Sequence, residues 1–277
     1  MAVTAQDVAA LRQKTGAGMM DCKKALTEAG GDFEQAIVLL RKKGQEISAN
    51  RAARDASEGG VFACVSTDNR EAFLLVMNCE TDFVAKNELF LQLGKNILAA
   101  AVAHRPSSME ALHALPLDHA TVQETIVASI GTIGEKIAIS AYETLKGDAA
   151  VLYIHAGNSL GVLVTLQGAT GERVIAAGRD VAMQVAAMNP IAVDKDQLDP
   201  ALVERERVII QEQVMREAFP ESKAEKITQG RLTKFFQENT LLDQPFVKNN
   251  KLTVAQFLKE IDPSLTVTAF KRISVGG

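Results

Sequence analysis

An internal repeat places the strongest constraint on the fold of this chain. Apolar and polar residues alternate over residues 61–67 and 72–79, and a polar turn at 68–70 separates the two segments. Alternation with a period of two predicts a β-hairpin. Apolar residues then recur at helical spacing over residues 81–103, so this part of the chain is expected to form one ββα unit.

The same order of elements returns about ninety positions later along the chain. Residues 150–155 and 160–166 alternate around a turn at Gly157 and Asn158, and a helical pattern begins near Gly171. Two copies of one unit predict an α+β fold with a duplicated core of antiparallel sheets. Further elements are expected as short helices and a final strand, over residues 109–114, 122–130, 253–261 and 266–275.

The first 55 residues have a different pattern, which predicts a module of three short helices. Each helix carries apolar residues at helical spacing, and glycines at 16, 18, 30 and 31 separate the helices. Thr4 and Asp32 are expected to cap the first and third helices. Gly44 is expected to end the third helix, and residues 45–57 to form a polar helical linker.

A charged helical segment is expected to form an inserted hairpin. Pro190 and Pro220 interrupt its helical pattern, and its apolar stripe is narrow. Such a stripe suits two helices that pack along each other and project as a coiled coil, whereas a surface helix of the core is the alternative. The helical module is expected to span residues 1–55, and the first core unit residues 56–140. The second core unit is expected in two pieces, residues 141–179 and 229–277, with the hairpin of residues 180–228 inserted between them.

Charge and composition disfavour several classes of function. The net charge of −4, the absence of Trp and an aromatic content of 5% disfavour direct binding of nucleic acid. The chain has no apolar run long enough to cross a membrane and no readable secretory signal, so a cytoplasmic protein without membrane contact is expected. Three unpatterned cysteines, Cys22, Cys64 and Cys79, favour free thiols over a disulfide framework or a zinc site.

Known catalytic motifs are missing from the sequence. It contains no G-x-x-x-x-G-K-[ST], no H-E-x-x-H and no G-x-S-x-G, so we expect no metal, no cofactor and no enzyme activity. An enzyme would need a nucleophilic pair such as Cys79 and His155, each at the end of an equivalent strand. A buried, structural Cys79 is the commoner arrangement.

Two sites stand out as candidate contact surfaces. Met19 and Met20 begin a helix beside Lys23, where flexible thioether side chains would suit contact with another protein. The alternative places both methionines in the core of the module. Thr81 is expected to cap the helix that follows the first hairpin, and Phe83 lies in its first turn, where the pattern alone favours a buried aromatic.

Two long motifs resemble the family of bacterial translation elongation factor Ts. They are TGAGMMDCKKAL over residues 15–26 and NCETDFVAK over residues 78–86. Shorter matches continue along nearly the whole chain, with IGE at 133–135, HAG at 155–157, GVLV at 161–164 and QPFV at 244–247. Long motifs at matching separation are more specific than any single short pattern. The resemblance implies a helical module like ubiquitin-associated domains, a duplicated core and a helical-hairpin insertion.

The resemblance also implies a partner and a set of contact residues. The family binds elongation factor Tu, in its GDP-bound and nucleotide-free forms, and promotes the release of GDP. In this reading Phe83 is an exposed wedge that acts with Asp82 on the magnesium site of the partner. The other implied contact positions are Met19, Met20, Lys23, Thr81, Val84, Ile133 and His155. A protein-binding adaptor that leaves nucleotide kinetics unchanged is the alternative function, and the charged hairpin is a candidate face for a homodimer.

Overall fold

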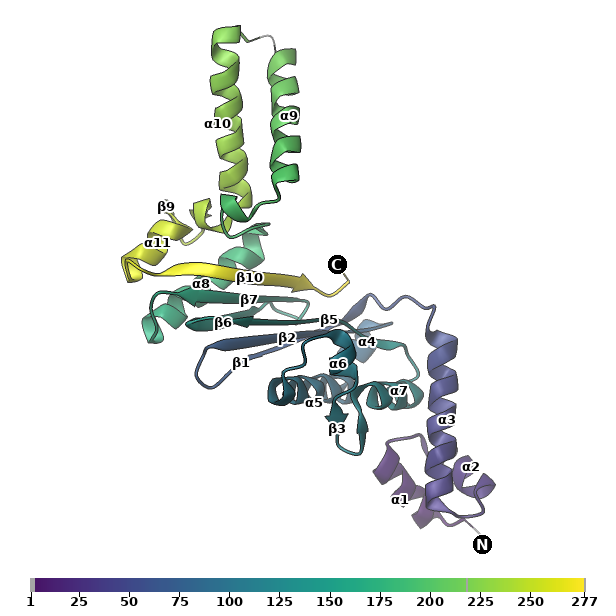
Figure 1. The fold of residues 1–277 in the computed structure, drawn as a ribbon. Helices are drawn as coiled ribbons and strands as arrows, with labels where there is room; N and C mark the ends of the chain where they lie inside the picture. The colour runs from purple at the N-terminus through teal and green to yellow at the C-terminus, as the bar shows by residue number, and fades with distance from the viewer. Residues whose placement is uncertain (1–2, 218, 277) are drawn as a thin grey trace.

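The computed structural model describes residues 3–217 and 219–276, and it begins with a three-helix module (Figure 1). Its helices are α1 (Ala5–Thr15), α2 (Met19–Glu28) and α3 (Phe33–Arg51). A capping box between Thr4 and Asp7 starts α1, and the Asp32 side chain accepts from the Gln35 amide at the start of α3. The helices enclose a small apolar core around Leu11, Cys22 and Leu26, as the sequence predicts.

The expected end of the third helix at Gly44 is wrong, because α3 continues through this residue to Arg51. Gly44 lies in the contact between α3 and the core helix α7 (Val122–Ile133). A Cβ atom at Gly131 of α7 would lie 3.1 Å from the Gly44 Cα atom. Gly44 therefore serves the close approach of two helices, and the residues expected as a linker mostly extend α3.

The core contains two three-stranded antiparallel sheets. The first sheet has the order β1-β2-β5 and consists of β1 (Glu58–Val65), β2 (Glu71–Cys79) and β5 (Ile137–Lys146). The second sheet has the order β10-β7-β6 and consists of β10 (Thr266–Ser274), β7 (Leu160–Gln167) and β6 (Ala149–Ile154). In each sheet the second strand of a hairpin is central, and a later strand pairs with its free edge. The predicted duplication and the α+β class are confirmed.

The two sheets pack face to face with helices outside them, giving four layers. Along β2, Phe73, Leu75 and Met77 face the cluster beneath the helices of the first unit. The alternate residues Leu74 and Val76 face the second sheet. The sheets approach so closely at Gly161 of β7 that a Cβ atom there would lie 2.5 Å from Val61 Cγ1.

Helices cover the outer face of each sheet. The first unit carries α4 (Asp82–Ala85), α5 (Glu88–His104), α6 (Met109–His113) and α7, with a small hairpin of β3 (Pro116–Leu117) and β4 (Ala120–Thr121). The second unit carries α8 (Glu172–Met188), α11 (Val254–Ile261) and a hairpin of β8 (Pro245–Phe246) and β9 (Asn249–Thr253). Short 3-10 turns lie at η1 (Lys195–Gln197) and η2 (Leu241–Asp243).

Two features differ from the predicted elements of the core. The helix expected over residues 81–103 is two helices, because Asn87 leaves the helical conformation and caps α5 with its side chain. Strand β5 is not among the predicted elements, and the expected boundary after residue 140 falls inside it. The pairing of β5 with β2 shifts by one residue opposite Val76 and Met77, and this shift interrupts the alternation of β5. Ile139 and Tyr142 of β5 therefore contact the same helix-side cluster.

The charged segment forms a hairpin that projects from the sheets, at the opposite end of the molecule from α1 and α2 (Figure 1). It consists of α9 (Pro200–Arg216) and α10 (Glu221–Asn239), which enclose a separate cluster around Ile210, Val214 and Leu232. The projecting hairpin is therefore confirmed and the surface helix is not. The expected bounds of 180–228 are wrong, because residues 180–188 belong to α8, which packs on the second sheet, and α10 continues to Asn239. Among residues 3–217 and 219–276, no helix is long and apolar enough to cross a membrane.

Candidate functional site

A short turn at the end of β2 presents Phe83 to solvent. The side chain is 82% exposed, an unusual state for a large aromatic. The next residue, Val84, is buried against the core of the first unit and fixes the turn from below. Thr81 caps α4 by accepting the Val84 amide on its hydroxyl. The buried alternative for Phe83 is therefore wrong, and the exposed position implied by the resemblance holds.

Two carboxylates fasten this turn to the chain before β5. Glu135 accepts from the Thr81 amide at 3.0 Å and from the Thr81 hydroxyl at 2.7 Å. Glu80 accepts from the Lys136 amide at 2.6 Å and from the side chains of Arg51 and Arg54. The Lys136 amide, followed by the two guanidinium groups, holds the pKa of Glu80 at about 2.

Asp82 is paired within its own helix. Lys86 donates to its carboxylate at 2.7 Å, and this contact lowers the pKa of Asp82. Both side chains are mostly exposed, so the pair is open to exchange with groups of another molecule. Asp82 and Phe83 thus lie together on one accessible edge of the core.

The turn after His155 lies near this edge. Gly157, Asn158 and Ser159 line a hollow of about 530 Å³ together with Asp82 and Lys86. The Asn158 carbonyl accepts from the Val61 amide, which fixes the turn against the first sheet. His155 itself is exposed, and its ring nitrogen Nδ1 lies 3.0 Å from the Tyr153 hydroxyl. The structure therefore brings the two motifs of the core to one side.

The start of α2 forms a second exposed surface, in the N-terminal module. Met19 is 48% and Met20 is 65% exposed, and Lys23 is exposed as well. Cys22 and Leu26, on the opposite side of the same helix, fill the core of the module. The alternative that places both methionines in the core is therefore wrong.

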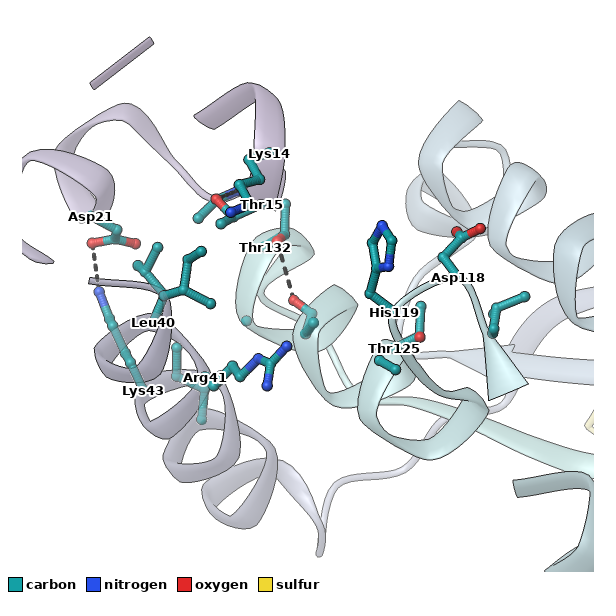
Figure 2. Close-up of a pocket in the computed structure, with 18 residues that line it drawn as sticks. Lys14, Thr15, Asp21, Leu40, Arg41, Lys43, Asp118, His119, Thr125 and Thr132 are labelled. Carbon is teal, nitrogen blue, oxygen red and sulfur yellow. Dashed lines mark hydrogen bonds and ion pairs between the residues drawn. The ribbon is translucent and has the colours of Figure 1, made fainter. Parts of the chain in front are cut away.

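Two hollows lie between this module and the core. The larger, of about 500 Å³, is lined by residues of α3, α7 and the β3–β4 hairpin, and Figure 2 shows Arg41 on one side and His119 on the other. Lys43 in its wall is paired with Asp21. None of the expected contact residues lines it. Ile133 instead lines the smaller hollow, of about 260 Å³, with Leu89 and with Thr15 at the end of α1.

The nucleophilic pair considered from the sequence does not form. Cys79 is buried and donates to the Thr81 carbonyl, and burial raises the pKa of its thiol to about 12. The His155 ring packs against Tyr153 in the other sheet. A thiol that stays protonated at neutral pH is a poor nucleophile. The described residues also contain no cluster of three potential metal ligands.

Sequence reasoning missed Glu80 and Glu135 as parts of this site. Both residues stand in the motifs quoted for the resemblance, but their roles depend on contacts between segments more than 50 positions apart. Such contacts leave no local periodicity in the sequence. The sequence signal for this contact is one acidic residue directly after β2 and another two residues before β5.

The chain matches known proteins over its whole length. The family model described as "Elongation factor TS" matches residues 80–277. The protein named "Elongation factor Ts" of Amoebophilus asiaticus is 56% identical over 100% of both chains. Proteins of the same name from Cytophaga hutchinsonii and Porphyromonas gingivalis are 51% and 44% identical over 99% of each chain.

The low pKa of Glu80 predicts an acid-sensitive fold. The carboxyl group titrates near 4.5 without its partners and at about 2 in the folded chain, so the unfolded state takes up the proton first as the pH falls. The stabilisation is complete above pH 4.5 and is lost as the pH falls toward 2. Glu80→Gln should lower the free energy of unfolding at neutral pH and flatten its decrease below pH 4.5, as measured by urea unfolding. Equal slopes for the variant and the wild type would contradict this assignment.

Proposed function

The chain belongs to the elongation factor Ts family, and from this membership we propose that it binds elongation factor Tu and releases GDP by disturbing the Mg²⁺ and phosphate site of that partner. The family consists of nucleotide exchange factors for elongation factor Tu in translation. Such a factor changes the rate at which a nucleotide leaves and catalyses no covalent chemistry. The mechanism below is our proposal for this chain.

The exposed Phe83 is the single observation that supports this mechanism best. Burying a phenylalanine side chain stabilises an interface by about 1.5–3 kcal/mol, and free Phe83 leaves most of this gain unused. We propose that the ring inserts beside the nucleotide pocket of the partner. Asp82, whose own partner Lys86 is solvent-exposed, would act on the adjoining magnesium site.

Release by this route needs no nucleophile. By linkage, a factor that prefers the empty pocket weakens GDP binding by the same ratio that GDP weakens binding of the factor. An acceleration of about 10⁴ requires a barrier about 5.5 kcal/mol lower. One buried aromatic supplies a large part of this amount, and loss of the metal contact to phosphate would supply the rest.

The remaining contact positions would orient the complex. Met19, Met20 and Lys23 offer an apolar surface with one cation on the N-terminal module. On the core, Ile133 lines the smaller hollow beside the module, and the turn that follows His155 lines the same hollow as Asp82. We propose that the module docks on the nucleotide-binding domain of the partner while the core carries the wedge.

The wedge is tested by fluorescent GDP leaving elongation factor Tu in stopped flow. Phe83→Ala should lower the release rate constant at saturating factor at least tenfold, because it removes the inserted ring. Met188→Ala serves as a control, since it removes a half-exposed apolar side chain from α8. An unchanged rate for Phe83→Ala would exclude the wedge.

Excess Mg²⁺ should slow the release of GDP by the wild-type chain, if the factor acts on the metal site of the partner. A release rate that does not depend on Mg²⁺ would exclude action on the metal site.

The docking role is tested by the concentration dependence of the same reaction. Met20→Ala should raise the factor concentration needed for half-maximal release about threefold to tenfold, because it removes an exposed apolar contact. The maximal rate should change little. Val38→Ala, which shortens another half-exposed side chain of the module, is the control. A normal half-maximal concentration for Met20→Ala would contradict docking through this surface. An adaptor would bind the partner without any change in nucleotide release.

We also propose that the hairpin can pair two copies of the chain. Val208, Ile209 and Met215 of α9 are exposed apolar side chains in an otherwise charged segment. Sedimentation equilibrium should show a dimer that Ile209→Asp converts to a monomer. A wild-type chain that sediments as a monomer at every concentration would contradict this pairing.

A further inference from the structure

The paired strands β2 and β5 end in an exchange of side-chain hydrogen bonds. Their backbone ladder closes at the pair Cys79 and Ile137. One residue further on β2, the Glu80 carboxylate accepts the Lys136 amide. In the opposite direction, the Glu135 carboxylate accepts both the amide and the hydroxyl of Thr81. The two segments therefore stay fastened to each other beyond the end of the sheet.

The helix that carries Phe83 depends on this attachment. Helix α4 has four residues, too few to be stable alone. Its geometry is fixed at Thr81, whose hydroxyl donates to Glu135 and accepts from the Val84 amide. A hydroxyl has one proton to donate, so the contact with Glu135 orients the lone pair that caps the helix.

The attachment also reaches the N-terminal module. Glu80 binds Arg51 at the end of α3 at 2.7 Å and Arg54 at 3.1 Å. Lys136 Nζ donates to the carbonyls of Ala52 and Arg54. The Glu80 carboxylate is thus paired with two guanidinium groups, and the Lys136 side chain joins the same segment to the residues that follow α3.

We propose that Glu135 is a positioning residue for Phe83, with Glu80 as its counterpart in the exchange of bonds. Glu135 touches no part of the partner in this proposal and acts through Thr81. It keeps α4 in one orientation in the free chain, so the ring meets the partner already ordered. The effect on release rests on the proposed function, whereas the effect on the mobility of the turn does not.

The mobility of the turn can be measured directly in the full-length chain. The sequence contains no Trp, so Phe83→Trp introduces a single indole at the position of the wedge. Its time-resolved fluorescence anisotropy reports local motion without any partner. In this background, Glu135→Ala should increase the amplitude of fast depolarisation at least twofold, and Glu135→Gln should restore part of the order by keeping one acceptor oxygen.

Two further variants keep the test informative if Glu135→Ala unfolds the chain. Thr81→Val removes the hydroxyl from the same contact and should also increase the fast motion, whereas Thr81→Ser keeps the hydroxyl and should not. Glu143→Ala is the matched control, because it removes another β5 carboxylate that is paired with Lys271 away from the turn. It should leave the anisotropy unchanged.

The same substitutions in the chain that retains Phe83 are then assayed for GDP release. Glu135→Ala should lower the maximal rate about tenfold while the half-maximal concentration changes less than threefold, and Glu135→Gln should recover most of the rate. A folded Glu135→Ala variant with unchanged anisotropy would overturn the proposal, even if release is slow. If the wild-type chain fails to accelerate release, the proposed function fails, and the anisotropy still decides the positioning role.

Discussion

Burial of strand β2 on both faces determines the arrangement of the core. Its odd-numbered apolar residues pack under α5 and α7, and its even-numbered ones pack against the second sheet. A strand buried on both sides must lie between two layers, which explains why the sheets stack face to face. Because β2 is central, its C-terminal end emerges where the first sheet, the helices above it and the end of α3 meet. The residues that follow β2 are therefore held by several elements at once.

This position lets the chain tolerate an exposed aromatic. The exposed Phe83 side chain adds no hydrophobic stabilisation to the free chain, whereas Val84 beside it belongs to the main core cluster. Val84 thus anchors the turn to the core, and Phe83 beside it faces solvent. Local departures from the usual burial of apolar residues are expected at functional sites, and the rest of the structure compensates for them. Here the compensation is the set of bonds around Glu80 and Glu135.

The repeated pattern was sufficient to predict the fold class, the hairpins and most helices, because each depends on local periodicity. Gly44 was misread, since its role in approaching α7 depends on a partner far along the chain. Strand β5 was missed because a bulge in it, opposite Val76 and Met77 of β2, shifts its alternation. At the candidate site, the exposure of Phe83 followed from family resemblance and contradicted its local pattern. The role of Glu135 needed the folded geometry, since its contact with Thr81 joins two segments that carry no common signal.

The proposed wedge is a single side chain, so the contacts that hold its turn in place are important to the proposal. One buried phenylalanine contributes about 1.5–3 kcal/mol. Fixing the backbone of a single residue costs about 1–2 kcal/mol, so ordering even two residues of α4 during binding would cancel that gain. In the proposed mechanism, Phe83 can act on a tightly bound nucleotide only if the free chain has already ordered the turn. Capping by Thr81 alone would order a four-residue helix only weakly. The hydrogen bonds from the amide and hydroxyl of Thr81 to the charged Glu135 carboxylate order the turn in the free chain, before any partner binds.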